Sequence, residues 1–215
     1  MSMVYFPSCK FSAFSPESSQ KICCYLQIRH NMIIGECCRK DRLSLTKEDS
    51  AVFICHTCRA ICEESSSAGY TLSLWEILDS DPQLPLPDYK GLALTVQDCR
   101  RSFDKTNEQK AVRNLLNKMN ISIIEQEDNF EKTKFCGISL FSGAHEENNM
   151  LAPKRFGQSN IFINLSEEEK VLRMKEHCQN ITTESVLCYC VTCAMGINAG
   201  GKKAIHLLDL IYDKS

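Results

Sequence analysis

The sequence has little of what marks a membrane-spanning, secreted or loop-rich chain. Of 215 residues only nine are glycine and six are proline, and no apolar run reaches the roughly 18 residues that a membrane helix needs. Neither sign of charge is in excess, because 25 basic and 27 acidic residues leave a net charge of −2, which gives no indication of nucleic-acid or anionic-membrane binding. The opening residues MSMVYFPSC lack a basic segment followed by a long apolar run. We therefore expect no secretion signal and a cytoplasmic protein.

Cysteine, in contrast, is abundant, with fourteen residues in the chain. A disulfide framework is not expected in a reducing compartment, and such frameworks belong mostly to short, loop-rich chains. Thiolates that bind iron or zinc are the favoured interpretation, and a secreted domain held by disulfides is the distant alternative. The cysteines stand at positions 9, 23, 24, 37, 38, 55, 58, 62, 99, 136, 178, 188, 190 and 193.

A proline-rich segment separates two halves that both alternate strands with helices. The stretch SDPQLPLPDY holds three of the six prolines, which predicts a first lobe over 1–80, a linker over 81–91 and a second lobe over 92–215. Apolar runs that end in cysteine predict strands, and amphipathic stretches predict helices. Strands are expected at 3–9, 50–55, 91–99, 121–125 and 185–190, helices at 15–32, 55–64, 71–78, 106–120, 166–178 and 204–211, and a loop at 140–160.

The two halves repeat one pattern of cysteines. In each half a strand runs into a Cys-x-x-Cys motif, and further cysteines precede it at similar places. Such a repeat predicts an α/β protein of two pseudo-repeated lobes, with small, mainly parallel sheets flanked by helices. The cysteines would meet at the carboxyl ends of the strands, where open α/β sheets bind ligands, and form metal sites there. The matching positions are Cys9 and Cys99, Cys37-Cys38 and Phe135-Cys136, and Cys55 with Cys58 and Cys190 with Cys193.

The order of these motifs resembles the CCG-type cysteine-rich domain of heterodisulfide reductases and related iron–sulfur oxidoreductases. YFPSC is similar to that family's Tyr-x-Pro-Gly-Cys, LTVQDCRR to its His-Asp-Pro-Cys-x-x-Arg, and FCGISLFSG to its Cys-Cys-Gly followed by small residues. The resemblance extends over nearly the whole chain. The departures are a shortened first half, Arg39 in place of the glycine after the first cysteine pair, and Phe135 in place of a cysteine.

The resemblance implies two metal sites and a redox role. In heterodisulfide reductase five cysteines bind a noncubane [4Fe–4S] cluster that splits a disulfide, whereas a set of four thiolates suits an ordinary [4Fe–4S] cluster or zinc. The family works beside a flavoprotein or ferredoxin-like subunit. Since this chain has no flavin or nucleotide motif, electrons would come from such a partner. The corresponding residues are Cys9, Cys37, Cys38, Cys55 and Cys58 in the first site, and Cys99, Cys136, Cys190 and Cys193 in the second.

We accordingly predict an iron–sulfur oxidoreductase subunit that reduces a small disulfide or transfers electrons with a partner protein. Two alternatives stay open, namely a non-catalytic electron relay and a zinc-stabilised module that binds another protein. His56 is the candidate for a catalytic role, as a hydrogen-bond donor to sulfur or as a proton source. The competing interpretation of His56 is an exposed histidine in a turn.

The other candidate residues have plainer interpretations. Cys188 aligns with Phe53 and is either a ligand or a core residue of a strand. Arg100 and Arg101 either bind an anion or form a solvated charge pair, His206 is expected to pack and cap a helix, and Trp75 is expected in the core. Four cysteines without counterparts in the repeat are expected to be buried small residues within helices: Cys23, Cys24, Cys62 and Cys178.

Overall fold

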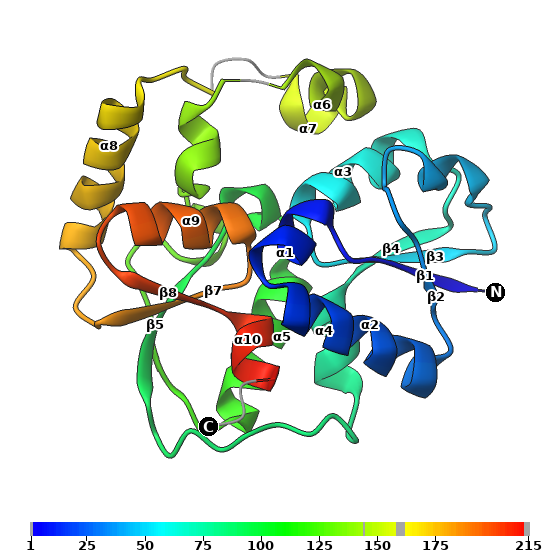
Figure 1. Cartoon of the computed structure of the whole chain (residues 1–215), viewed down its shortest axis with the longest axis horizontal. Coiled ribbons are helices and arrows are strands. Elements are labelled where there is room, and N and C mark those ends of the chain that lie inside the picture. The colour runs from blue at the N-terminus through cyan, green and yellow to red at the C-terminus, as the bar shows by residue number, and fades with distance from the viewer. Residues whose placement is uncertain (1, 144, 158–161, 213–215) are drawn as a thin grey trace. The chain divides into compact units, whose positions relative to one another are not determined.

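The computed structural model describes residues 2–143, 145–157 and 162–212, and the chain divides into two compact units (Figure 1). Unit 1 comprises Met1–Ile77 and Ala144–Asn160, and unit 2 comprises Leu78–Gly143 and Ile161–Ser215. Each unit has its own four-stranded sheet of parallel strands with helices beside it. The predicted α/β class, with two lobes built on parallel sheets, is therefore confirmed.

Unit 1 is built on a sheet with the strand order β2-β1-β3-β4. Helices α2 and α3 lie on opposite sides of this sheet (Figure 1), as right-handed crossovers that leave its centre in opposite directions require. The strands are β1 (Met3–Phe6), β2 (Ile33–Ile34), β3 (Ser50–Phe53) and β4 (Tyr70–Ser73). The helices are α1 (Cys9–Phe14), α2 (Pro16–His30), α3 (His56–Ser65), α4 (Leu74–Ser80), α6 (Glu146–Leu151), α7 (Pro153–Phe156) and the 3-10 helix η1 (Asp41–Ser44).

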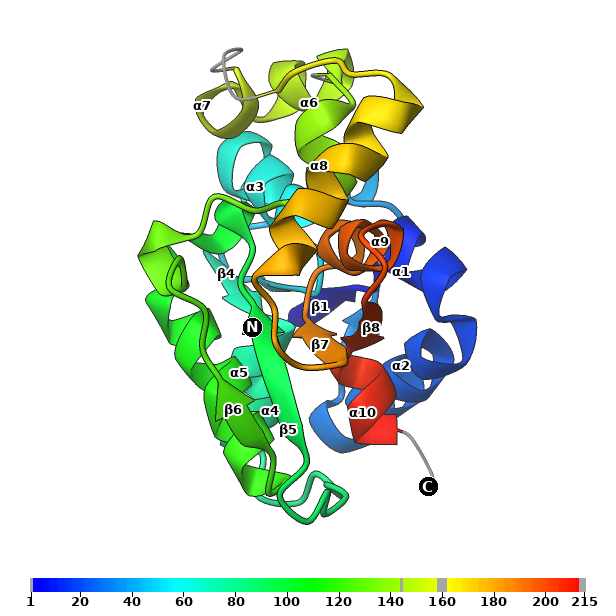
Figure 2. The same ribbon diagram turned by 90° about the vertical axis from the view of Figure 1, so that its left-hand side faces the viewer.

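Unit 2 repeats the arrangement with the strand order β6-β5-β7-β8. Helices α5 and α9 lie on opposite sides of its sheet (Figure 2). The strands are β5 (Ala93–Gln97), β6 (Ser122–Ile124), β7 (Ser185–Cys188) and β8 (Lys203–His206). The helices are α5 (Thr106–Lys118), α8 (Glu167–Gln179), α9 (Val191–Ala199), α10 (Leu207–Tyr212) and the 3-10 helices η2 (Arg100–Ser102), η3 (Phe130–Lys132) and η4 (Gly137–Phe141).

The division between the units differs from the predicted lobes of 1–80 and 92–215 with a linker at 81–91. The boundary between the units falls within α4. The segment with α6 and α7 belongs to unit 1, although in sequence it comes after β5 to η4, which belong to unit 2. The backbone N–H groups of Lys154 and Arg155, in the first turn of α7, donate to the Glu64 carboxylate at 2.8 and 2.9 Å. These polar contacts and the burial of Ala152 and Phe156 hold the segment in unit 1. The loop predicted for 140–160 was wrong where the structure describes it, because α6 and α7 lie there, while residues 144 and 158–160 lie outside the described residues.

The sequence did not predict the short strand β2 of unit 1, nor the strand β4 or β8 on the other edge of each sheet. The stretches expected as helices at 71–78 and 204–211 begin as β4 and β8, which pair with β3 and β7 at the sheet edges. At the end of each strand a buried side chain then starts the helix. The Ser73 hydroxyl accepts from the Trp75 N–H and the His206 Nδ1 accepts from the Leu208 N–H, both at 3.3 Å. The expected capping role of His206 is thus confirmed, and so is the burial of Trp75.

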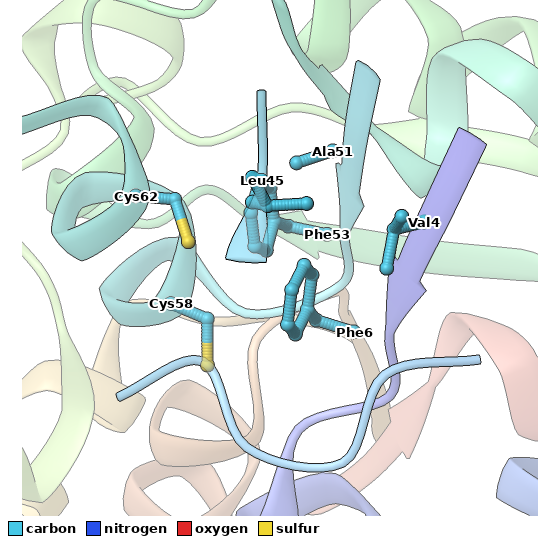
Figure 3. Packing of buried hydrophobic residues seen from close by; sticks show 7 residues of the cluster. All are labelled: Val4, Phe6, Leu45, Ala51, Phe53, Cys58 and Cys62. Carbon is cyan, nitrogen blue, oxygen red and sulfur yellow. The ribbon is translucent and has the colours of Figure 1, made fainter. Parts of the chain in front are cut away.

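Other helices follow the predicted pattern closely. The apolar stripe of α5 is fully buried, and α8 begins with the expected capping box between Ser166 and Glu169. In unit 1, Phe6 and Phe53 stack with ring centroids 5.1 Å apart, and Cys58 and Cys62 from α3 belong to the same buried cluster (Figure 3). No helix among the described residues is both long and apolar enough to cross a membrane.

Candidate metal centres

The sheet of unit 2 brings two cysteines together at the carboxyl ends of adjacent strands. Cys99 follows β5 at the N-cap position of η2, and Cys190 follows β7 at the N-cap position of α9. The strands β5 and β7 are neighbours, and the chain leaves them in opposite directions toward β6 and β8. In doubly wound sheets this change of direction opens the crevice in which ligands bind.

Four thiols meet at this place, and we call Cys99, Cys136, Cys190 and Cys193 the unit 2 thiol group. The Sγ atoms of Cys99 and Cys136 are 3.6 Å apart, and those of Cys99 and Cys190 lie within 4.8 Å. The Cys193 thiol hydrogen-bonds with those of Cys136, Cys190 and Cys99. All but Cys190 are buried. The structure therefore brings together the whole predicted second set of ligands.

Burial and mutual hydrogen bonds control the ionisation of these thiols. Burial is the main reason why the pKa values of Cys99 and Cys193 lie well above the ordinary thiol value. Hydrogen bonds from Cys193 and Cys99 hold the pKa of Cys136 well below that value, and Arg101 acts in the same direction. Four thiolates cannot share one buried site without a compensating cation. A metal ion supplies that charge and displaces the thiol protons on binding.

Hydroxyl groups surround the same sulfur atoms. The Thr192 hydroxyl lies 3.2 Å from the Cys190 Sγ, and the Ser139 hydroxyl lies 3.2 Å from the Cys136 Sγ. The Tyr189 hydroxyl accepts from the Cys99 N–H at 3.4 Å. The Ser139 hydroxyl donates to the Cys136 carbonyl at 2.8 Å, so the Thr192 hydroxyl is the one of these groups that can donate to a thiolate and stabilise its charge.

A close backbone contact brings Cys136 to α9. Gly137, directly after Cys136, has a φ of 56°, and a Cβ at this position would lie 1.7 Å from the Thr192 carbonyl oxygen. Only glycine combines this conformation with this approach. The glycine of the FCG motif therefore has a physical role, because it allows η4 to pack on the first turn of α9.

The residue before Cys99 forms a buried ion pair. The Asp98 carboxylate accepts two hydrogen bonds of 2.7 Å from the Arg113 guanidinium, and the Tyr189 hydroxyl donates to it at 2.7 Å. Burial opposes the charge on Arg113, but hydrogen bonds with Glu125 and Asp98 raise its pKa. The Asp98 side chain is fully buried. This network fixes the backbone on which Cys99 stands, and none of its members was identified from the sequence.

Unit 1 gathers fewer thiols, and we call Cys38, Cys55 and Cys58 the unit 1 thiol group. The Cys58 thiol hydrogen-bonds with those of Cys38 and Cys55. The hydrogen bond with Cys58 lowers the pKa of Cys38, whereas the hydrogen bonds with Cys38 and Cys55 raise that of Cys58 well above the ordinary value. Cys58 is buried, while Cys38 and Cys55 are half-buried.

The thiols of the other two predicted ligands of the first site, Cys9 and Cys37, are not members of this group. Among the described residues neither the Cys9 thiol nor the Cys37 thiol hydrogen-bonds with the unit 1 thiol group, and Cys9 is exposed. Strand register explains Cys9. Phe6 pairs with Phe53, and Gln97 pairs with Cys188, so the counterpart of Cys99 is Ser8. The sequence match of Cys9 with Cys99 was therefore wrong by one residue.

The two thiol groups differ in what they fit. Four thiolates at about 2.3 Å from one tetrahedral ion stand about 3.8 Å apart, close to the 3.6 Å between Cys99 and Cys136. Thiolates of a cubane cluster bind different irons at its corners, so their sulfurs lie farther apart than the irons do. The unit 2 thiol group fits a single ion such as zinc. The unit 1 thiol group offers three ligands, so a five-thiolate noncubane cluster does not fit it.

The remaining candidates are placed as follows. His56 begins α3 and is buried, so its interpretation as an exposed turn histidine was wrong. Cys188 is a buried residue of β7. Cys62 and Cys178 are buried as expected, Cys23 is half-buried, and Cys24 is exposed, which contradicts its expected burial. The Arg101 guanidinium lies 5.9 Å from the centre of the Phe162 ring.

Comparison of the chain with models of protein families, with curated proteins and with solved structures finds no match. The resemblance to the CCG-type domain therefore stays a prediction that depends on the motifs.

Proposed function

We propose that this chain is a metal–thiolate redox subunit in which unit 2 carries a structural ion and unit 1 carries the reactive centre. One observation supports this division. The unit 2 thiol group has four thiols with three of them buried, whereas the unit 1 thiol group has three thiols with two of them half-buried. Structural metal sites are closed by four protein ligands, and reactive sites keep a position open.

Zinc suits the unit 2 thiol group best, because the sulfur spacing matches a single tetrahedral ion. Cys99, Cys136, Cys190 and Cys193 would hold it, and the Thr192 hydroxyl would stabilise the charge of the Cys190 thiolate. The ion would join the ends of β5 and β7 to α9 and to the loop around Cys136. Its contribution would be to the stability of unit 2.

Iron is the favoured metal for the unit 1 thiol group, since the motifs resemble those of iron–sulfur oxidoreductases. When bound there, an iron centre would supply electron transfer and a position for an outside sulfur ligand. Cys38, Cys55 and Cys58 would hold it at the end of β3. The substrate would be a small disulfide, and the electrons would come from a flavoprotein or ferredoxin-like partner in the cytoplasm.

A zinc-stabilised, non-catalytic module is the second candidate, and it is favoured by the unit 1 thiol group, which gathers three thiols where a noncubane cluster needs five. In that case zinc would be bound in unit 1 as well, or unit 1 would bind no metal. The two candidates differ in iron content and in reactivity toward disulfides. They agree on zinc in unit 2.

Anaerobic purification followed by zinc, iron and sulfide analysis and an absorption spectrum tests the proposal. We expect about one zinc together with iron, and disulfide reduction by a reduced dye. Cys136→Ser should remove zinc, Cys58→Ser should remove iron and the activity, and Cys24→Ser, at an exposed thiol, should change neither. A colourless protein with zinc and no iron would leave the second candidate. A fully iron-loaded protein without turnover would reject the enzyme and leave an electron relay.

A further inference from the structure

Unit 2 contains a cavity that the thiol groups do not use. Its volume is about 200 Å³, which about seven molecules of liquid water would fill. The cavity lies beside Phe135, the residue that replaces the expected cysteine of the repeat. Its walls are formed by Gln97, Gln126, Asp128, Thr133, Lys134, Phe135, Leu140, Phe141, Arg173, Met174 and His177.

The hydrogen bonds of His177 determine which ring nitrogen can meet a ligand. The Gln97 side-chain N–H donates to the Asp98 carbonyl at 2.9 Å, so its Oε1 is the acceptor. The His177 Nε2 lies 2.6 Å from this Oε1 and must therefore be the donor. Burial lowers the pKa of His177, which favours the neutral ring. Within the described part of the chain His177 makes no other hydrogen bond, so Nδ1 stays available as an acceptor.

The walls combine apolar surface with two cations at the rim. The His177 ring stacks on Phe135 with ring centroids 3.9 Å apart and an interplanar angle of 14°. Phe141 and the buried Met174 add further apolar wall. Lys134 and Arg173 are both exposed, and their ion pairs with Asp128 and Glu176, at 3.7 and 3.1 Å, are of the weak surface kind.

The polar groups of this cavity are not a requirement of the fold. Gln97 pairs with Cys188 in the register in which Phe6 pairs with Phe53 in unit 1. Unit 1 thus fills the position of Gln97 with an apolar ring that stacks on Phe53. In unit 2 a buried glutamine stands there instead, and its side chain is hydrogen-bonded to the Asp98 carbonyl, to Gln126 and to His177, a polar network that unit 1 does without. The orientation that Gln97 gives to the His177 ring is useful if the other ring nitrogen binds a ligand.

We propose that this cavity binds a small hydroxy-substituted aromatic carboxylate. Its hydroxyl donates to the His177 Nδ1, its ring packs between Phe141 and the Phe135–His177 stack, and its carboxylate meets Lys134 and Arg173 at the rim. The cavity is large enough for one such ring and is mostly apolar with a few oriented polar groups, as small-molecule sites are. The site is separate from the thiol groups and does not depend on which metal they bind.

Titration of the ¹⁵N-labelled, metal-loaded protein with 4-hydroxybenzoate, followed through the backbone amide resonances of Lys134, Leu140 and Phe141, which the variants keep, tests the proposal. We expect saturable binding, and at least tenfold weaker binding of benzoate, which lacks the donor, and of 4-hydroxybenzamide, which lacks the charge. His177→Gln preserves the donor to Gln97 but removes the Nδ1 acceptor and should lose at least tenfold in affinity. His145→Gln, at an exposed histidine, should bind as the parent does.

Arg173→Gln serves as the second variant, because the Arg173 side chain is 58% exposed and its replacement should leave folding intact. It should weaken binding of 4-hydroxybenzoate several-fold and leave binding of 4-hydroxybenzamide unchanged. Absence of saturable shifts for all three compounds would overturn the proposal. Equal affinity of the parent and His177→Gln for 4-hydroxybenzoate would overturn it as well.

Discussion

Units 1 and 2 share one strand order but differ in the thiol groups at the ends of their strands. Unit 2 gathers four thiols and unit 1 gathers three, although both began with a full set of candidates in sequence. The difference arises at the positions after the first strand, where Pro7-Ser8 stand in unit 1 and Asp98-Cys99 in unit 2. A shared fold therefore does not guarantee a shared site, because a single residue of offset moves a thiol off the site.

A second difference lies at the residue after the middle cysteine. Gly137 lets Cys136 approach α9, whereas Arg39 follows Cys38 and sends its side chain to Glu147, with the Arg39 Nε 3.0 Å from a carboxylate oxygen. The same position thus serves backbone packing in unit 2 and an ion pair with α6 in unit 1. The first arrangement encloses the thiol beside it, and the second leaves Cys38 half-buried.

The largest expected effect comes from Asp98, which has no acidic counterpart in unit 1. Asp98→Ala leaves the buried Arg113 guanidinium without its bidentate partner, and we expect a loss of about 4 kcal/mol in the free energy of unfolding of unit 2. Urea denaturation with zinc bound measures it. Pro7→Ala, at the matching position of unit 1, should lose less than about 1 kcal/mol. Comparable losses for the two variants would show that the network is not what distinguishes the units.

Exchange of the residues after the middle cysteines is the next test. Gly137→Ala forces a Cβ to 1.7 Å from the Thr192 carbonyl oxygen at a positive φ, and should destabilise unit 2 by about 3 kcal/mol and weaken zinc binding. Arg39→Gly should cost about 1 kcal/mol, because it removes only a partly exposed ion pair. Thermal unfolding and zinc affinity measure both. A Gly137→Ala protein that keeps the parent's zinc affinity would refute the proposed role of this contact.

The pH response should also differ between the units. Burial lowers the pKa of His206 to about 4, below the roughly 6.5 of an unfolded histidine. The unfolded state therefore takes up a proton first, and stability present above pH 6.5 is lost as the pH falls toward 4, by up to about 3 kcal/mol. His206→Ser installs the residue that unit 1 has at this position, Ser73, and should remove this part of the acid sensitivity. Urea unfolding of the metal-depleted parent and variant at pH 7 and pH 4.5 measures this loss of stability. An equal loss in the two proteins would contradict the assignment of the acid sensitivity to His206.

Much of the fold could be predicted from the sequence, because periodicity and strand-ending cysteines carry strong local signals. The stripe of α5 and the capping box of Ser166 are of this kind. The edge strands β4 and β8 could not be predicted, since their pairing with β3 and β7 outweighs a local pattern that favours helix. The return of α6 and α7 to unit 1 depends on contacts such as that of Glu64 with the α7 backbone, which no local pattern reveals.

The candidate sites show the same limit more sharply. The Cys-x-x-Cys motif correctly predicted two members of the thiol group in each unit, because its cysteines are fixed to a strand end and a helix start. The match of Cys9 with Cys99 failed because counting along the sequence cannot fix strand register, in which a single residue matters. Roles for Asp98 and Gly137 beside the thiols could have been predicted, because both residues belong to motifs that carry the family resemblance, QDC and FCG. The pairing of Gln97 with His177 has no signal in sequence, since 80 residues separate them.

The register itself offers the finest test of the comparison. Ser8 is buried and caps α1 at the position that Cys99 occupies in unit 2. Ser8→Cys in a Cys9→Ser background should therefore add a fourth thiol to the unit 1 thiol group and tighten its cobalt affinity by about tenfold, or about 1.4 kcal/mol. Competition with a chelator measures the affinity, with zinc kept in unit 2. Cys9→Ser alone should bind cobalt as the parent does, because the exposed Cys9 thiol does not join the group. A loss of cobalt affinity in Cys9→Ser would mean that Cys9 reaches the metal after all, and that the register is not what separates the two units.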